Sequence, residues 1–171
     1  MQQNIFKIRQ AFLIPLWAII VLLFLLFVLS MFDTQMWGKI TAALFFIIVL
    51  IVGIEATKRE VIVAEEKLTM KKFFRKKEFS WAEITHLGIV ELGKKVYFLL
   101  TTTKGFYFFS NLMEKHSMLA RLIAEKLGEE KVEPEVRKYL EQPVERLSLI
   151  VMSYVTILII VIIIFLRLLP V

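Results

Sequence analysis

Three long runs of apolar residues, separated by polar segments, limit what this chain can fold into. The first run, 11–31, has no charged side chain over about 21 residues, and a helix of that length spans a hydrocarbon core of about 30 Å. A signal peptide would have a shorter apolar core followed by small residues, but Phe27, Leu29, Met31 and Phe32 stand at that place. The run therefore predicts a transmembrane helix that is retained.

The second and third runs, 38–56 and 147–167, also have the length of transmembrane helices. Only a short polar break around Asp33 separates the first two runs, and a break of that length holds no domain. The first two runs therefore predict a helical hairpin. The whole pattern predicts three transmembrane helices, with a short segment, 1–10, before the first.

Two features of the second run have a possible role inside the membrane. Gly38 and Ala42 lie four residues apart, a spacing that allows close contact between helices. Glu55 lies near the end of the run, followed by Arg59 at the i+4 position. The carboxylate is either a functional group within the membrane or, as we favour, an interfacial partner of Arg59.

The composition agrees with a membrane protein that carries one modest soluble domain. Hydrophobic residues make up 58% of the chain, and the mean hydropathy is +0.70, whereas soluble domains are nearer half apolar. Roughly ninety residues remain outside the three runs, enough for one small core. The chain has no cysteine, which excludes disulfides and thiolate metal sites. The net charge of +6, beside membrane helices, favours an anionic lipid surface over nucleic acid as the partner.

Basic residues near the ends of the apolar runs predict the orientation of the chain. Lys7 and Arg9 precede the first run, and Lys58 and Arg59 follow the second, whereas the connection between these runs has only Lys39. Cytoplasmic loops carry the excess of lysine and arginine. We therefore predict a multi-pass protein of the cell membrane, with its N-terminus and central domain in the cytoplasm and its C-terminus outside.

Between the second and third runs the pattern changes to that of short strands. Residues 60–110 alternate between apolar and polar side chains, are rich in β-branched and aromatic residues, and are interrupted by turn-forming dipeptides. We predict turns at 65–66, 75–76, 92–95 and 104–105, and six strands between and around them.

A helix is predicted to close this central domain. It begins after a cap at Ser110 or Asn111, presents an apolar face, and ends at Leu127 before Gly128, a common helix stop. The charged segment that follows, 129–146, has the composition of a linker or a short surface helix leading into the third run.

A short motif in the central domain has a counterpart in a known family. Phe79-Ser80-Trp81-Ala82-Glu83-Ile84 combines a capping box, which predicts one helical turn, with a W-x-x-I step between strands. With the closing helix and the flanking apolar runs, residues 58–128 resemble the bacterial pleckstrin-homology-like (PH-like) domain. The resemblance implies a partly open, orthogonally packed β-barrel capped by one helix, in small bacterial membrane proteins that are mostly of uncharacterised function. The family has seven strands, one more than the sequence pattern indicates.

A run of basic residues without an intervening acid is the most distinctive feature of the central domain. Near an anionic leaflet each cation contributes about 1 kcal/mol, within a Debye length of about 8–10 Å. The alternative is that these side chains are solvated and serve topology and solubility. Within the run, one of Phe73 and Phe74 is expected to face the core and the other to be free to touch lipid. The candidate lipid- or partner-binding residues are Lys67, Lys71, Lys72, Arg75, Lys76 and Lys77.

The sequence contains no pattern that predicts a catalytic, cofactor or metal site. His86 and His116, the only histidines, have no second ligand at metal-binding spacing, and no Ser–His–acid set or phosphate-binding glycine pattern is present. Trp81 is expected to be a core anchor. The aromatic residues of 106–109, beside the basic run, are compatible with base stacking, but no nucleic-acid motif accompanies them and such strands usually fill cores.

These observations lead to two hypotheses. The first is a non-enzymatic multi-pass membrane protein whose cytoplasmic PH-like domain binds the anionic inner leaflet or a protein partner, such as another membrane protein. The second is a component of a small membrane transport, resistance or immunity system that acts through its helices. The second needs polar groups at membrane depth, and only Glu55 and Arg167 lie near the ends of the runs. A membrane-bound enzyme is the least favoured class.

Overall fold

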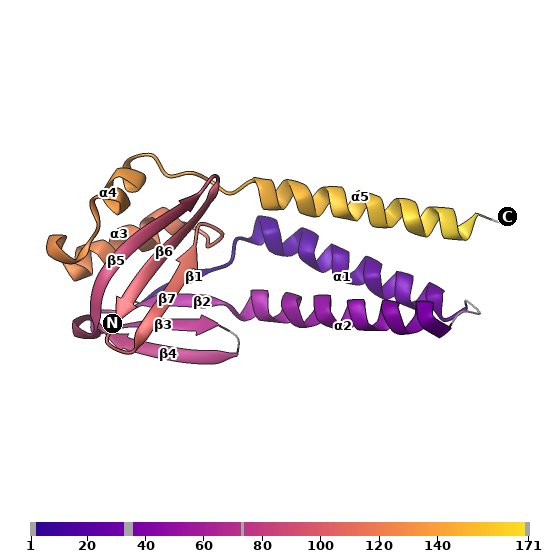
Figure 1. Cartoon of the computed structure of the whole chain (residues 1–171), viewed down its shortest axis with the longest axis horizontal. Coiled ribbons are helices and arrows are strands. Elements are labelled where there is room, and N and C mark those ends of the chain that lie inside the picture. The colour runs from indigo at the N-terminus through magenta and orange to yellow at the C-terminus, as the bar shows by residue number, and fades with distance from the viewer. Residues whose placement is uncertain (1–2, 33–35, 73, 170–171) are drawn as a thin grey trace. The chain divides into compact units, whose positions relative to one another are not determined.

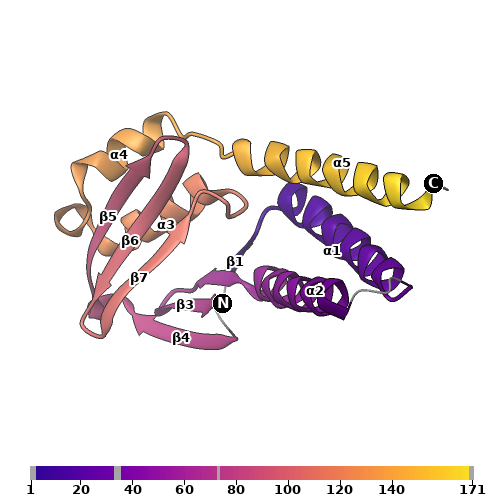
Figure 2. The same ribbon diagram turned by 45° about the vertical axis from the view of Figure 1, so that its right-hand side comes forward.

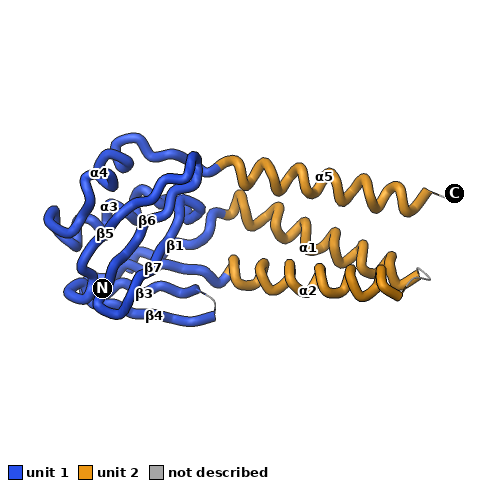
Figure 3. The backbone as a smooth tube through the Cα atoms, viewed as in Figure 1, with its two compact units in different colours: residues 1–9, 58–146 blue, residues 10–57, 147–171 orange. Residues whose placement is uncertain are grey.

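The computed structural model describes residues 3–32, 36–72 and 74–169, so the predictions made for Asp33 and Phe73 lie outside the described residues. The chain divides into two compact units, shown in Figure 3. Unit 1 comprises Met1–Arg9 and Lys58–Arg146, and unit 2 comprises Gln10–Thr57 and Leu147–Val171.

Unit 2 consists of three long apolar helices, α1, α2 and α5 (Figure 1). They confirm the three apolar helices that the sequence predicts, and each is long and apolar enough to cross a membrane. Their most apolar windows have mean hydropathies of 3.1, 2.5 and 3.2. The bounds are Gln10–Ser30 for α1, Met36–Lys58 for α2 and Ser148–Leu168 for α5.

Packing between these helices uses only part of their apolar surface. Leu23 of α1 is buried against Ile160 and Ile164 of α5, and Ile20 of α1 is buried in a cluster with Ala56 of α2. Most of the remaining apolar side chains are exposed within the structure. Apolar surface of this extent is unfavourable in water and favourable in lipid.

The small residues of α2 do not act as the sequence suggested. An added Cβ at Gly38 would meet no atom within 4 Å, so this glycine makes no close contact, whereas one at Gly53 would collide with Ile20 of α1. Close approach therefore occurs at Gly53. Glu55 is buried and has an interaction partner, as a buried carboxylate requires.

Unit 1 contains two antiparallel sheets (Figures 1 and 2). In the first sheet the strands follow the order β1-β2-β3-β4. Strand β1 comes from the N-terminal segment, for which the sequence predicts no strand. Phe6 of β1 is buried and lies opposite Val61 of β2. The strands are β1 (Asn4–Lys7), β2 (Glu60–Val63), β3 (Lys67–Lys72) and β4 (Arg75–Ser80).

The second sheet follows the chain in the order β5-β6-β7. It is reached through a single 3₁₀ turn, η1 (Trp81–Glu83), in which the Ser80 N–H donates to the Glu83 carboxylate at 3.0 Å, as a capping box requires. The strands are β5 (Ile84–Leu92), β6 (Lys95–Thr102) and β7 (Gly105–Ser110). The described part of the chain therefore has seven strands in two sheets, and these sheets do not form one closed barrel.

The two sheets share a core and meet at one corner. Phe79 of β4 contacts Tyr107 of β7 with ring centroids 4.4 Å apart. At the corner, Ile8 forms a bridge to Met113, the residue that follows β7 by three positions. The core also contains buried side chains from both sheets and from the following helix, among them Leu68, Ile84, Phe98, Leu100, Leu119 and Ile123.

The closing helix, α3 (His116–Leu127), begins later than the sequence predicts. Asn111 is not its cap. Its side chain is buried, and its Oδ1 accepts from the Val96 N–H at 3.3 Å. Lys115, directly before the helix, has a left-handed backbone with φ of 50°. The predicted end is confirmed, since α3 stops at Leu127 and Gly128 has φ of 79°.

The segment predicted as a linker or a short surface helix belongs to unit 1 and contains a short helix. After the short turn η2 (Glu129–Lys131), the Glu133 N–H donates to the Leu87 carbonyl at 3.0 Å, which covers the free edge of β5. Helix α4 (Pro134–Glu141) then buries Val136 and Tyr139. Only two of the eight α4 residues are buried, and most of the others are charged. The composition of the segment therefore did not predict that this helix packs against the rest of unit 1.

Candidate functional site

The basic residues of the candidate site lie on one hairpin formed by β3 and β4. Lys72 is paired with Arg75 at the tip, and Lys71 with Lys76 one step away. The predicted turn at Arg75–Lys76 is wrong, because β4 already begins at Arg75 and the chain turns before it. Phe74 lies in that turn with φ of 58°, and its side chain is 63% exposed.

Strand alternation divides the basic side chains between the two faces of the hairpin. Lys72, Arg75 and Lys77 lie on the face that carries the buried Leu68 and Phe79, and Lys72 Nζ lies 3.5 Å from the ring centroid of Phe108. The remaining three basic residues lie on the opposite face, with Glu78 among them: Lys67, Lys71 and Lys76. The structure therefore brings all six together on one hairpin but divides them between the two faces of the sheet.

Carboxylates pair with several of these cations. Glu78 accepts from Lys67 Nζ at 2.7 Å and from Lys76 Nζ at 2.5 Å. Glu60 accepts from Lys71 Nζ at 2.8 Å and lies 3.2 Å from Lys7 Nζ. Exposed pairs of this kind add little to stability, but they lower the positive charge that the hairpin presents.

The Lys67 and Lys76 ammonium groups lower the pKa of the Glu78 carboxyl to about 2, through hydrogen bonds. Because this pKa is depressed in the folded state, the pairing contributes to stability above the ordinary pKa of about 4.5 and is lost as the pH falls through about 2. We expect an NMR titration of the Glu78 carboxyl carbon in the full chain to give a midpoint well below that of an ordinary glutamate.

Replacement of Lys67 by methionine is the matched variant for this titration. The variant removes the largest cause of the shift, so the titration midpoint of Glu78 should rise. The midpoint of Glu83 should stay unchanged, because hydrogen bonds from Lys104 and from the Ser80 backbone lower the pKa of that carboxyl. A Glu78 midpoint that is ordinary in the parent chain would contradict the pairing.

Ion pairs connect residues of unit 1 that lie next to the three places where the chain enters or leaves the apolar helices. Arg9, which directly precedes α1, pairs with Glu145, three residues before α5, at 3.0 Å. Lys7 pairs with Glu60, which begins β2 two residues after the end of α2. All of these side chains belong to unit 1.

The tip of the β3–β4 hairpin lies on the same side of unit 1 as these connections. Glu60 is paired with Lys71 in the sheet register, so the tip is level with the end of α2 in the chain. Lys58 Nζ lies 5.3 Å from the ring centroid of Phe74, within the range of a cation–π contact. We call this surface the junction face and define it by Lys7, Arg9, Lys58, Glu60, Lys71, Lys72, Phe74, Arg75 and Glu145.

A structural explanation also exists for part of the basic run. Strand β4 is an edge of the first sheet, and charged side chains on an edge strand oppose pairing with a further strand. This explanation fits Lys76 and Lys77 in the middle of β4. It does not explain Lys71 and Lys72, which lie on the inner strand β3.

The other residues singled out in the sequence have local structural partners. The Trp81 indole N–H donates to the Glu65 carbonyl at 2.9 Å, which holds η1 against the preceding turn. His86 Nε2 lies 2.8 Å from a Glu133 carboxylate oxygen, and His116 Nε2 lies 3.0 Å from the Tyr139 hydroxyl. Within the described ranges, no group of three or more metal-ligating side chains is placed to hold a metal ion.

Two pairs of side chains in unit 1, His86 with Glu133 and His116 with Tyr139, contain groups with shifted pKa values. A hydrogen bond from His86 lowers the pKa of the Glu133 carboxyl, which favours the charged form at the β5 edge. Burial lowers the pKa of His116 and raises that of the Tyr139 hydroxyl, so this pair is neutral near pH 7. A neutral buried pair is the arrangement with the lower desolvation cost.

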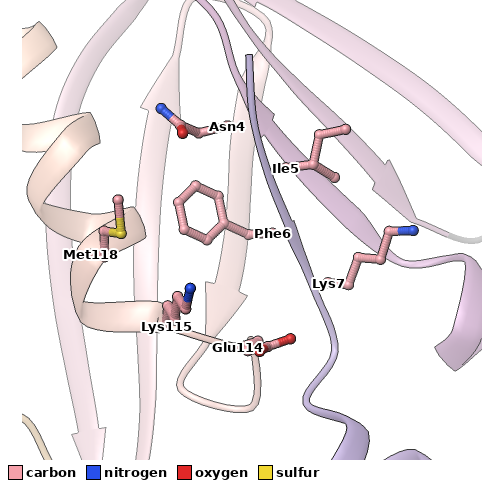
Figure 4. Close-up of a pocket in the computed structure, with 7 residues that line it drawn as sticks. All are labelled: Asn4, Ile5, Phe6, Lys7, Glu114, Lys115 and Met118. Carbon is pink, nitrogen blue, oxygen red and sulfur yellow. The ribbon is translucent and has the colours of Figure 1, made fainter. Parts of the chain in front are cut away.

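A pocket of about 230 Å³ lies between β1 and the start of α3 (Figure 4). Its charged groups are Lys7, Glu114 and Lys115, and Ile5 and Met118 add exposed apolar surface. Lys7 is already paired with Glu60. The lining residues include no histidine, serine or cysteine.

The chain matches no protein-family model, and comparisons with curated proteins and with solved structures also find no match. The site is therefore interpreted from its own geometry.

Proposed function

We propose that this chain is a non-enzymatic, multi-pass protein of the bacterial cell membrane, whose cytoplasmic unit 1 is a PH-like domain that binds the anionic inner leaflet through its junction face. The observation that carries the proposal is that the connections to the apolar helices and the cationic hairpin tip occupy the same side of unit 1.

Chain connectivity supports this orientation. Arg9 is adjacent to the first residue of α1, and Lys58 is the last residue of α2. A residue spans at most about 3.6 Å of extended chain, so helices that enter the bilayer at these points keep the junction face within a few ångströms of its surface. The charged side chains there then face the lipid headgroups.

The charge of the face fits an anionic surface. Its cations outnumber its two carboxylates, Glu60 and Glu145. Each added cation near an anionic leaflet contributes about 1 kcal/mol, which is about fivefold in a docking equilibrium. Phe74 at the exposed tip adds an aromatic side chain that suits the interface between headgroups and hydrocarbon. The seven strands and closing helix, together with the W-x-x-I step, support the PH-like assignment.

The test uses the full chain in nanodiscs. Because the chain has no cysteine, a single Phe74→Cys variant takes one polarity-sensitive fluorophore. Its emission should shift towards that of an apolar environment in discs of phosphatidylcholine mixed with phosphatidylglycerol, more than in discs of phosphatidylcholine alone. The difference should shrink as salt is raised. Thr103→Cys, in the exposed β6–β7 turn near η1, is the position control.

The charge control compares two triple variants in the Phe74→Cys background. Changing Lys71, Lys72 and Arg75 to glutamine should abolish most of the response to anionic lipid. The same change at three exposed basic residues elsewhere should leave the response intact; these are Lys104, Arg121 and Lys126. Equal responses in neutral and anionic discs, or equal losses in the two triple variants, would refute the leaflet proposal.

A further inference from the structure

The tip of the β5–β6 hairpin combines an exposed leucine with two lysines. Leu92, the last residue of β5, is 61% exposed. Gly93 follows with φ of 61°, which allows the tight turn. Lys94 and Lys95 complete the turn and begin β6. An exposed leucine at a turn is unfavourable in water unless the side chain meets an apolar partner.

Asn111 fixes this tip to the segment that leads into α5. Its side-chain amide donates to the Lys94 carbonyl at 3.1 Å and to the Val144 carbonyl at 3.0 Å. The Tyr139 hydroxyl donates to the same Val144 carbonyl at 3.0 Å. Asn111 and Tyr139 are both buried, so the tip and Val144 are held by groups that are shielded from water.

Through Asn111 the tip is connected to Val144, and Val144 lies just before an apolar helix in the chain. Val144 precedes Ser148, the first residue of α5, by only a few residues, and that stretch spans at most about 14 Å. Glu145 in the same stretch is paired with Arg9, next to α1. The β5–β6 tip thus adjoins the junction face by a different route from that of the β3–β4 tip.

We propose that the β5–β6 tip is a second lipid contact, in which Leu92 inserts among the acyl chains and Lys94 and Lys95 lie at the level of the lipid phosphates. The inference rests on the proposed function, because it requires α5 to enter the bilayer. Lysines beside an apolar side chain match the layered chemistry of an anionic leaflet, with phosphate outside hydrocarbon. Two separated contacts fix the tilt of unit 1 on the leaflet, whereas one contact leaves it free to pivot.

The experiment places a fluorophore at Leu92→Cys in the full chain, with one chain per anionic nanodisc. Lipids that carry a quencher on the acyl chain should quench this probe several-fold more than the Thr103→Cys probe, and water-soluble iodide should quench it less. In the Phe74→Cys background, Leu92→Ser should lower the equilibrium constant for docking about tenfold, the change expected when one leucine side chain loses its apolar environment.

The outcomes separate the two proposals. If the Leu92 probe is no better quenched by lipid than the Thr103 probe while the Phe74 probe still responds to anionic lipid, the second contact is refuted and the leaflet proposal stands. If the Leu92 probe is shielded from both quenchers, protein covers the tip and the lipid assignment is wrong. If the Phe74 probe does not respond, the proposed function itself fails, whatever Leu92 shows.

Discussion

Replacement of Phe98 by alanine is expected to lower the free energy of unfolding of unit 1 by about 3–5 kcal/mol. Phe98 is fully buried, with 0% of its surface exposed. Its ring stacks on Phe109 with centroids 4.8 Å apart and meets Tyr139 edge-on at 5.5 Å. The substitution therefore leaves a cavity where the second sheet meets α4, and it removes two aromatic contacts.

Hydrogen exchange of the unit 1 amides, with the chain in nanodiscs, measures this loss without unfolding the apolar helices. The matched control is Phe106→Ala on the neighbouring strand β7, where the ring is 75% exposed. This change should alter the free energy by less than about 0.5 kcal/mol. Similar losses from the two substitutions would contradict the position of Phe98 at the centre of the core.

Replacement of Val136 by aspartate is expected to detach α4 from the rest of unit 1. Val136 is 0% exposed, so an aspartate in its place would be buried. Burial of an unpaired carboxylate costs several kcal/mol, so undocking of the helix becomes the cheaper outcome. The expected loss exceeds about 3 kcal/mol for the amides of 134–141, and the Leu87–Glu133 pairing at the β5 edge should open with them.

The same hydrogen-exchange measurement tests this expectation, with Lys138→Asp as the control. Lys138 lies on the exposed side of α4, so the same new side chain there should cost below about 1 kcal/mol. Absence of protection at 134–141 in the parent chain would show that the segment is a linker after all. Equal effects of the two aspartates would show that Val136 is not buried in solution.

Local sequence patterns predicted the elements whose signals are complete within a short window. The apolar runs gave α1, α2 and α5, because hydrophobicity over about twenty residues suffices to identify such helices. The capping box at Ser80 and the stop at Gly128 are likewise local signals, and both are found in the structure.

Elements that depend on distant partners were missed. Strand β1 is only four residues long and is defined by pairing with β2, some fifty residues later in the chain. Asn111 looks like a helix cap in sequence, but its side chain is used to hold Lys94 and Val144. Helix α4 has an apolar side with two buried side chains, Val136 and Tyr139, but it is only eight residues long, and its docking depends on partners far away in the chain.

For the candidate site, the sequence predicted the basic run but not its distribution. The predicted turn lay at 75–76, whereas β4 already begins at Arg75, so the cross-strand partners of the basic residues could not be predicted correctly. The neutralising carboxylate of Lys71 is Glu60, on a different strand. The junction face could not be predicted, because it depends on β1 and on Glu145, both in segments that were expected to lie outside the domain.

The pairing of β1 with β2 also constrains how the protein is made. These neighbouring strands lie on either side of the α1–α2 hairpin in the chain. If α1 and α2 cross the membrane, as we propose, the strands can meet only when both ends of that hairpin finish on the same side. A nascent chain in which one of the two helices failed to insert would leave β1 and β2 on opposite sides, and Phe6 would have no core to join. Completion of the first sheet is thus a check on correct insertion.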